Sequence, residues 1–299
     1  MTVSATYPDR TLPEPRAMLR LIKPITGFPP VWAFLCGAVS SGVPVLQNWA
    51  PVLMGMVLAG PIVCGMSQAA NDWCDRHVDA VNEPDRPIPS GRIPGRWGLW
   101  IALAMTALSL AVGWLLGPWG FGATVVGVIA AWAYSAEPIR LKRNAWWGPG
   151  LVGLSYEGLP WFTGAAVLLS AAPRFEVVVM AILYALGAHG IMTLNDFKAL
   201  EGDRQHGVRS LPVTLGPEVA ARIACTVMGL AQALVIAFLL VLGQPWHALA
   251  VTALLALQIA AMRVLFRDPK GKAPWYNGTG VVLYVTGMMV TAFALRGLG

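Results

Sequence analysis

Long apolar stretches constrain this chain more than any other feature. Nine of them, each about 17–25 residues long, lie at 25–43, 49–70, 98–116, 120–136, 148–170, 174–195, 219–242, 246–265 and 278–296. A helix of that length spans the hydrocarbon core of a bilayer, where every backbone polar group must be satisfied within the protein. The sequence therefore predicts an all-α, polytopic membrane protein with about nine transmembrane helices that form a single domain over residues 1–299.

The basic residues indicate how these spans are oriented. All 21 Lys and Arg except Arg174 and Arg296 lie in the N-terminal segment or in and beside the loops that follow the second, fourth, sixth and eighth spans. By the positive-inside rule that side faces the cytoplasm, so the N-terminus is inside and, with nine spans, the C-terminus is outside. Membrane topology thus accounts for the net charge of +6, and no nucleic-acid partner is expected.

The N-terminal segment, residues 1–24, is expected to stay on the cytoplasmic side. It contains prolines and basic residues but no apolar core typical of a secretory signal peptide. A short helix lying in the membrane interface is expected over residues 17–24. The four cysteines have no metal-type spacing, so they are interpreted as small apolar fillers and no disulfide is expected.

Two acidic clusters, residues 71–79 and 195–203, each end a long apolar run. Carboxylates near a bilayer core cost roughly several kcal/mol, so two clusters at the same kind of boundary need a reason. A bound divalent metal is the leading one. Both clusters, with the loops that follow them, show a similar order of acids, a basic residue and a Pro- or Gly-containing turn. Either an internal duplication or convergence on one ligand explains this similarity.

Helical spacing groups the oxygen-bearing side chains of each cluster. If the second span stays helical, Asn71, Asp75 and Asp79 recur at i, i+4 and i+8 on one face. Asp196 and Asp203 are seven apart and share a face, with Asn195 and Glu201 adjacent. Such oxygens suit Mg²⁺, which keeps positions for substrate phosphate. Both clusters are expected to face a central cavity open toward the cytoplasm; a solvated helix end explains one cluster but poorly explains two.

Basic and intramembrane polar residues complete the predicted site. Candidate diphosphate contacts, which also serve topology, are Arg76, Arg140, Lys142, Arg204 and Arg209. Ionisable groups within spans suggest function, and aromatic rings beside them could pack a flat acceptor. Candidate acceptor contacts are Tyr134, Tyr156, Glu157, Trp161 and His189. A buried hydrogen-bonding role is the alternative for Glu157, and for His189 a neutral ring satisfied by a neighbouring helix is favoured.

Several motifs resemble a known family. Asn-Asp-x-x-Asp-x-x-x-Asp at 71–79, Arg-Pro-Ile-Pro-Ser-Gly at 86–91 and the second Asp-rich motif resemble the intramembrane aromatic prenyltransferases of ubiquinone biosynthesis, and the nine-span layout agrees over nearly the whole chain. Within that family, the stretches 134–142, 156–162 and 195–203 resemble the chlorophyll and bacteriochlorophyll synthases, the latter above all.

The resemblance implies a reaction and its participants. A polyprenyl diphosphate (geranylgeranyl or phytyl), bound through Mg²⁺ or Mn²⁺, ionises to an allylic cation that the propionate carboxylate of bacteriochlorophyllide attacks. It also implies a bacterial inner (intracytoplasmic) membrane, contact with membrane lipid, and pigment-assembly proteins as partners. The implied metal-binding and catalytic residues are Asn71, Asp72, Asp75 and Asp79 at the first motif, and Asn195, Asp196 and Asp203 at the second.

One departure and three alternatives stay open at this point. Many family members have Asp where this chain has Ala199, so the second site could instead use Asp196, Asn195 or Glu201. A family transferase with a quinone or haem acceptor shares the Asp motifs. An ion-coupled transporter would typically place acids near the bilayer midplane, and a pigment-binding scaffold would need no metal. The sequence fixes neither the prenyl tail, the chlorin type nor the oligomeric state.

Overall fold

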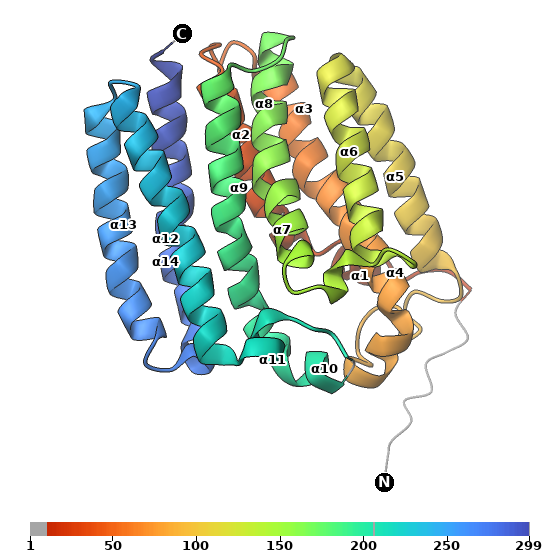
Figure 1. Ribbon diagram of the computed structural model, residues 1–299. Helices are drawn as coiled ribbons and strands as arrows, with labels where there is room; N and C mark the ends of the chain where they lie inside the picture. The colour runs from red at the N-terminus through yellow and green to blue at the C-terminus, as the bar shows by residue number, and fades with distance from the viewer. Residues whose placement is uncertain (1–10, 206, 299) are drawn as a thin grey trace.

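The computed structural model describes residues 11–205 and 207–298 as a bundle of long helices with no β-strand in those residues (Figure 1). This confirms the predicted all-α class. The α-helices are α1 (Pro15–Ile22), α2 (Phe28–Ser40), α3 (Trp49–Val57), α4 (Gly65–Asn82), α5 (Trp97–Leu115), α6 (Gly117–Ser135), α7 (Trp147–Gly153), α8 (Leu159–Leu169), α9 (Phe175–Asn195), α10 (Leu200–Gln205), α11 (Leu211–Leu215), α12 (Pro217–Val241), α13 (Pro245–Leu265) and α14 (Pro269–Arg296).

Length and composition make this a multi-pass membrane protein. Among the described residues, seven helical segments are long and apolar enough to cross a bilayer. The predicted spans 120–136 and 148–170 coincide with α6 and with the α7 to α8 segment, which are helical but are not among the seven. The count of nine crossings therefore stays a prediction.

Two of the long helices contain a wider, π-helical stretch. Segment η2 (Leu58–Cys64) joins α3 to α4 and contains Pro61, whose missing N–H and bulky ring disturb the regular α-helical bonding. Segment η4 (Leu154–Gly158) joins α7 to α8. Such bulges are frequent at functional sites. Here both segments line the same cavity, described below.

Small residues let the helices pack closely in the absence of a hydrophobic driving force between them. A Cβ added to Gly37 of α2 would lie 1.9 Å from the Trp161 carbonyl oxygen of α8. A Cβ added to Gly164 of α8 would lie 2.1 Å from the Phe34 carbonyl oxygen of α2. The two backbones therefore touch, and any side chain larger than hydrogen at either position would separate α2 from α8.

The short helix α1 packs across the end of α4. Ala17 and Leu21 are buried against Ala69 and Ala70, while Leu19 on the opposite face is 60% exposed. This one-sided pattern confirms a helix in the N-terminal segment, over Pro15–Ile22 rather than 17–24. Its predicted place in the membrane interface stays a prediction.

Candidate active site

A cavity lies between α2, the α3 to α4 helix, α6 and the α7 to α8 segment. It encloses about 1120 Å³, counting the part open to the outside. Apolar residues, among them Phe34, Leu58 and Val63, line most of it. Its polar lining is Ser67, Gln68, Asn71, Thr124, Tyr134, Ser155, Tyr156 and Thr163. A mainly apolar space with a few polar groups, Asn71 among them, suits a ligand that has both a polar and a lipid-like part.

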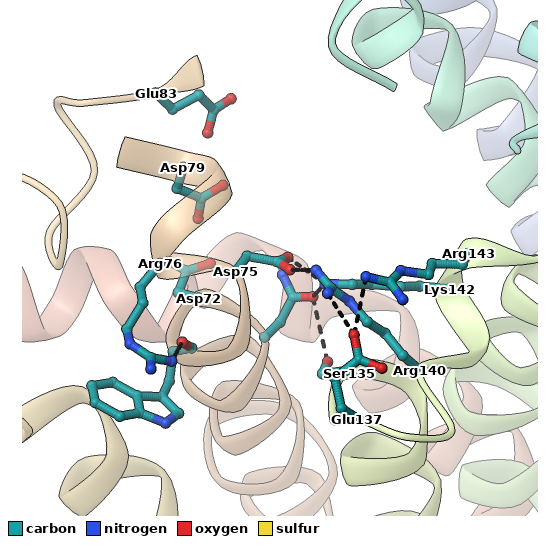
Figure 2. Close-up of polar contacts among 12 residues, drawn as sticks. Asp72, Asp75, Arg76, Asp79, Glu83, Ser135, Glu137, Arg140, Lys142 and Arg143 are labelled. Atoms are coloured by element: carbon teal, nitrogen blue, oxygen red, sulfur yellow. Dashed lines mark hydrogen bonds and ion pairs between the residues drawn. The ribbon is translucent and has the colours of Figure 1, made fainter. Parts of the chain in front are cut away.

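The first acidic cluster lies on one continuous helix, as predicted, because α4 runs through to Asn82. Asn71 and Asp75, one turn apart, both hold the ammonium group of Lys142. The Lys142 Nζ atom lies 3.1 Å from Asn71 Oδ1 and also contacts the Asp75 carboxylate. Arg140 donates to the other Asp75 oxygen at 2.8 Å. Figure 2 shows these side chains converging on Asp75.

The other two acids of the cluster are held differently. Arg86 pairs with Asp79 at 2.8 Å and with Asp72 at 3.5 Å, and Lys23 pairs with Asp72 at 2.8 Å. The Asp72 side chain is only 2% exposed. Positions seven apart on a helix share a face more closely than positions eight apart, so Asp79 falls in line with Asp72 rather than with Asn71. The predicted stripe is therefore broken: Asn71 and Asp75 meet Lys142, whereas Asp79 joins Asp72 at Arg86.

The loop after α6 carries the cations that meet Asp75. Arg140, in the left-handed backbone region at φ 38°, is held by Glu137 at 2.9 Å, and Glu137 also pairs with Arg143 at 3.0 Å. The hydrogen bond from Arg140 lowers the pKa of the exposed Glu137 carboxyl. Burial lowers the pKa of Arg140, but Glu137 and Asp75 outweigh it and the net shift is upward. Burial lowers the pKa of the Lys142 ammonium, and Asp75 opposes that shift.

The second cluster does not continue α9 as a straight helix. After Asn195 the chain tightens into the 3₁₀ segment η5 (Asp196–Ala199) before α10 begins. Asp196 and Asp203 nevertheless lie close enough to interact electrostatically. The Tyr134 phenol lies within electrostatic reach of Asp75, Asp196 and Asp203. Tyr134 lines the cavity, but of the candidate ligands in the two clusters only Asn71 does, so a cavity shared by both clusters stays a prediction.

Side chains from later elements hold the second cluster in place. Ser210 donates to Asp203 at 2.8 Å, Lys270 pairs with Glu201 at 3.3 Å, and Asn277 donates to Asn195 Oδ1 at 2.8 Å. A backbone bridge joins Arg209 to Asn144, which links this loop to the one that carries Lys142. Sequence reasoning missed Ser210 and Asn277. The sequence could have pointed to Asn277 only because a polar amide stands directly before the apolar stretch 278–296.

The other predicted basic residues, Arg76, Arg204 and Arg209, make no contact with Asp75 in the described part of the chain. Arg76 stacks over the Trp73 ring, 4.0 Å from its centroid, and donates to the Trp73 carbonyl (Figure 2). Arg204 and Arg209 are exposed at the cluster's outer edge. All three would need a side-chain movement to meet a ligand held between the clusters.

The predicted acceptor contacts fall into three groups. Tyr134 and Tyr156 line the cavity, and Tyr156 accepts a hydrogen bond from Gln68 at 3.1 Å. Trp161 is fully buried, donates to Ser40 at 3.1 Å and stacks on Tyr184, so its ring packs the core outside the cavity lining. Glu157 and His189 are also buried outside that lining. Within the described part of the chain, the Glu157 Oε2 atom meets no hydrogen-bond partner, and the His189 ring stacks on Trp146.

The donor set around Lys142 fits a metal ion. Within the described residues no three His, Cys, Asp or Glu side chains come close enough to form a complete metal site. The Asn71 amide oxygen and the Asp75 carboxylate nevertheless converge on one cation, the Lys142 ammonium. Mg²⁺ is typically held by one or two carboxylates and completed by water and substrate phosphate, so a small set of oxygens matches this ion.

Known proteins that are similar in sequence or in fold identify the family. The chain is 74% identical over 298 residues, covering 100% of this chain and 99% of the relative, to the bacteriochlorophyll synthase 33 kDa chain of Cereibacter sphaeroides. It is 37% identical to the chloroplastic chlorophyll synthase of Oryza sativa, covering 92% of this chain and 76% of the relative. The fold matches a solved UbiA homologue from Archaeoglobus fulgidus bound to GPP and Mg²⁺, with a TM-score of 0.69, 19% identity, and coverage of 94% and 99%.

The match to the family covers most of the chain, from the end of the N-terminal segment into α14. Residues 27–286 match the UbiA prenyltransferase family, and both acidic clusters and the cavity lie within that range. The chain is a membrane prenyltransferase and belongs to the UbiA prenyltransferase family.

Proposed function

We propose that this chain transfers a polyprenyl group, geranylgeranyl or phytyl, from its diphosphate to the propionate carboxylate of bacteriochlorophyllide and releases diphosphate. The observation that carries the proposal is the 74% identity over the full length to a protein named bacteriochlorophyll synthase. The identity to a chlorophyll synthase is half as high, at 37%. Identity of this size favours the bacterial pigment over the plant pigment as acceptor.

The first acidic cluster is proposed to receive the diphosphate end of the donor. Asn71 and Asp75 would hold Mg²⁺, for which Mn²⁺ could substitute, and the bound ion would draw negative charge onto the departing diphosphate. Lys142 and Arg140, already directed at Asp75, would contact the diphosphate oxygens. Such pre-organised positive charge stabilises the charge that develops on a leaving group.

The two Arg86-bound carboxylates, Asp72 and Asp79, have less freedom to change partners. Asp79 would join the metal site only if its 2.8 Å pair with Arg86 loosened. Asp72 is held from two sides, by Lys23 and Arg86. We propose that Asp72 acts by positioning α4 and its neighbours, while Asn71 and Asp75 act on the ligand directly.

The second cluster is proposed to complete the diphosphate site from the opposite wall. Asp196 and Asp203 interact electrostatically with each other, and Asp75, Asp196 and Asp203 all lie within electrostatic reach of the Tyr134 phenol. Because both acidic clusters and the diphosphate are negatively charged, cations must lie between them. Arg204 and Arg209, exposed nearby, are the proposed additional diphosphate contacts from this side, and Arg76 from the other.

The bond changes need no strong general base. The allylic carbon–oxygen bond breaks with its electron pair leaving on the diphosphate, and an oxygen of the propionate supplies the pair for the new ester bond. The propionate is already ionised near neutral pH, so no proton has to be removed. Tyr134 and Tyr156 line the cavity where the donor chain and the acceptor would meet, and Glu157 and His189 are proposed to act on the acceptor after local movement.

Product analysis by mass tests the proposed function. Membranes containing the protein are supplied with geranylgeranyl and phytyl diphosphates in competition, and with bacteriochlorophyllide and chlorophyllide in competition. We expect Mg²⁺-dependent formation of esterified bacteriochlorophyllide and release of one diphosphate per ester. Esters formed only on chlorophyllide, or on a quinone, would reassign the acceptor. No diphosphate release with any metal would remove the enzymatic proposal.

Single substitutions test the two acidic clusters. We expect Asp75→Ala and Asp203→Ala each to lower turnover by about 100-fold or more, the scale of losing one pre-organised electrostatic contact. Size-exclusion chromatography in detergent checks that each variant stays folded. Activity like that of the wild type in Asp75→Ala would show that the ion is held elsewhere.

A further inference from the structure

The two π-helical segments meet at one polar point in the wall of the cavity. Cys64 is the last residue of η2, and Tyr156 lies in the middle of η4. The Cys64 Sγ atom lies 3.3 Å from the phenol oxygen of Tyr156, and the Gln68 amide of α4 donates to the same oxygen at 3.1 Å. All three residues line the cavity. A thiol, a phenol and an amide from separate segments therefore form one trio inside a mainly apolar space.

The Tyr156 hydroxyl can offer its proton to a ligand. Its oxygen accepts from Gln68, and the Cys64 thiol beside it is shared with the Thr26 carbonyl oxygen at 3.3 Å. Sulfur is a weak hydrogen-bond partner. The nearby Ser67 hydroxyl is already engaged, since it donates to the Cys64 carbonyl oxygen at 2.8 Å. A hydrogen bond from a hydroxyl to a carboxylate is roughly twice as strong as one between neutral groups, so a carboxylate beside Tyr156 would take the phenolic hydrogen bond.

Other polar groups of the cavity lining are less suited to an anion. The Thr124 and Thr163 hydroxyls donate to backbone carbonyl oxygens of their own helices, at 2.7 and 2.6 Å. Tyr134 lies within electrostatic reach of three carboxylates of the acidic clusters, whose charge would repel another carboxylate. The hydrogen-bond partners of Tyr156, in contrast, are a neutral thiol and a neutral amide. Tyr156 is therefore the hydroxyl of this lining best placed to receive a carboxylate.

The trio lies about one helical turn from the proposed diphosphate site. Gln68 and Asn71 are three residues apart on α4, so their Cα atoms are separated by about 4.5 Å along the helix axis. Asn71 is proposed above to hold the metal ion that binds the diphosphate. An attacking oxygen has to approach to roughly 3–3.5 Å from the carbon that it will bond. One turn of helix leaves room for that carbon between a carboxylate at Tyr156 and a diphosphate at Asn71.

We propose that Tyr156 binds the propionate carboxylate of the acceptor, and that Gln68 is a positioning residue that holds the Tyr156 phenol. The inference rests on the proposed function, which supplies this acceptor. One carboxylate oxygen accepts the hydrogen bond from Tyr156, and the other supplies the electron pair for the ester bond as the diphosphate leaves. An anion in a mainly apolar space is stable only when it is hydrogen-bonded. The trio thus acts on the reacting group of the acceptor rather than on its ring.

Acceptor binding measured without the prenyl donor tests the inference. Purified protein in detergent is titrated with bacteriochlorophyllide and, separately, with the methyl ester of its propionate, and binding is followed by the fluorescence of the pigment. We expect the wild type to bind the acid more tightly than the ester. In Tyr156→Phe the acid should bind about 10- to 100-fold less tightly, the scale of losing a hydrogen bond to a charged group. The ester should lose about threefold at most, because its hydrogen bond is between neutral groups.

Two further variants separate carboxylate binding from a general effect on packing. Gln68→Met removes the amide that holds Tyr156, so it should weaken acid binding by about 3- to 10-fold and add no loss to Tyr156→Phe in the double variant. Tyr276→Phe is the matched control. Tyr276 also accepts from a glutamine amide, that of Gln258, at 3.1 Å, but lies outside the cavity lining. It should bind the acid as the wild type does. If Tyr156→Phe does not fold, Gln68→Met alone carries the test.

The inference and the proposed function fail in distinguishable ways. Equal binding of acid and ester by the wild type, or equal acid binding by the wild type and Tyr156→Phe, overturns the inference. The function still stands in either case if the wild type forms the pigment ester. Weaker binding of geranylgeranyl diphosphate in Tyr156→Phe, with acid binding unchanged, would assign the trio to the donor and overturn the inference as well. A wild type that neither binds bacteriochlorophyllide nor forms its ester removes the proposed function together with the inference.

Discussion

At the scale of single residues, neighbouring acids on α4 belong to different parts of the molecule. Asp72 is held by Lys23, just before α2, whereas Asp75 is held by Lys142 and Arg140 from the loop after α6. Helical spacing could predict that Asn71 and Asp75 share a face. It could not predict which cation each acid meets, because Lys23, Arg86 and Lys142 reach α4 only through the tertiary fold.

The Lys23 to Asp72 pair is expected to contribute to stability rather than to donor binding. Lys23→Met leaves the Asp72 carboxylate, which is 2% exposed, with only the 3.5 Å contact to Arg86. Leaving a buried charged group short of a partner costs about 1–3 kcal/mol, so the apparent Tm in detergent should fall by about 2–10 °C. Arg20→Met, which removes an exposed charge from α1, the helix that ends just before Lys23, is the control. Equal Tm values for the two variants would contradict this role for Lys23.

At the scale of helices, the sequence predicted where the helices lie better than it predicted the departures from α-helical geometry within them. The nine apolar stretches match helical segments, but the π-helical segments η2 and η4 and the 3₁₀ segment η5 were not foreseen. Pro61 signals the first of these, since proline removes a donor. Nothing comparable marks Leu154–Gly158 or Asp196–Ala199. Their geometry is set by packing against neighbouring helices, which is invisible to periodicity.

The contact between α2 and α8 should depend on two glycines. Gly164→Ala would place a Cβ 2.1 Å from the Phe34 carbonyl oxygen, where backbone rather than a flexible side chain must move. Overpacking of this kind costs about 3 kcal/mol, so thermal inactivation in detergent should be much faster than in the wild type. Gly122→Ala, in α6, meets no atom within 4 Å and should be neutral or slightly stabilising. Equal inactivation rates would mean that α2 and α8 can separate without loss.

At the scale of the whole molecule, the two basic residues predicted for the outer side lie at one end of the helix bundle. Helices α1, α10 and α11 lie at one end of the bundle, whereas α14 finishes at the other (Figure 1). Arg174, one of the two basic residues predicted for the outer side, donates to the Leu295 carbonyl oxygen near the end of α14 at 2.7 Å. Both exceptions to the basic pattern, Arg174 and Arg296, therefore lie at the same end. The positions of Lys and Arg could predict this grouping, because the charge of the loops decides how the helices insert into the membrane. They could not predict where the cavity lies.

Labelling of introduced cysteines tests the orientation of the whole bundle. Val81, near the end of α4, is 74% exposed, and Leu46, in the turn before α3, is 89% exposed at the opposite end. If the acidic clusters face the cytoplasm, a membrane-impermeant maleimide should modify Val81→Cys only in inside-out vesicles and Leu46→Cys only in right-side-out ones. Cys36, Cys64 and Cys225 are buried, so replacing the half-exposed Cys74 by alanine provides the background. The reverse pattern would place both clusters on the outer face, where a cytoplasmic prenyl diphosphate could not reach them.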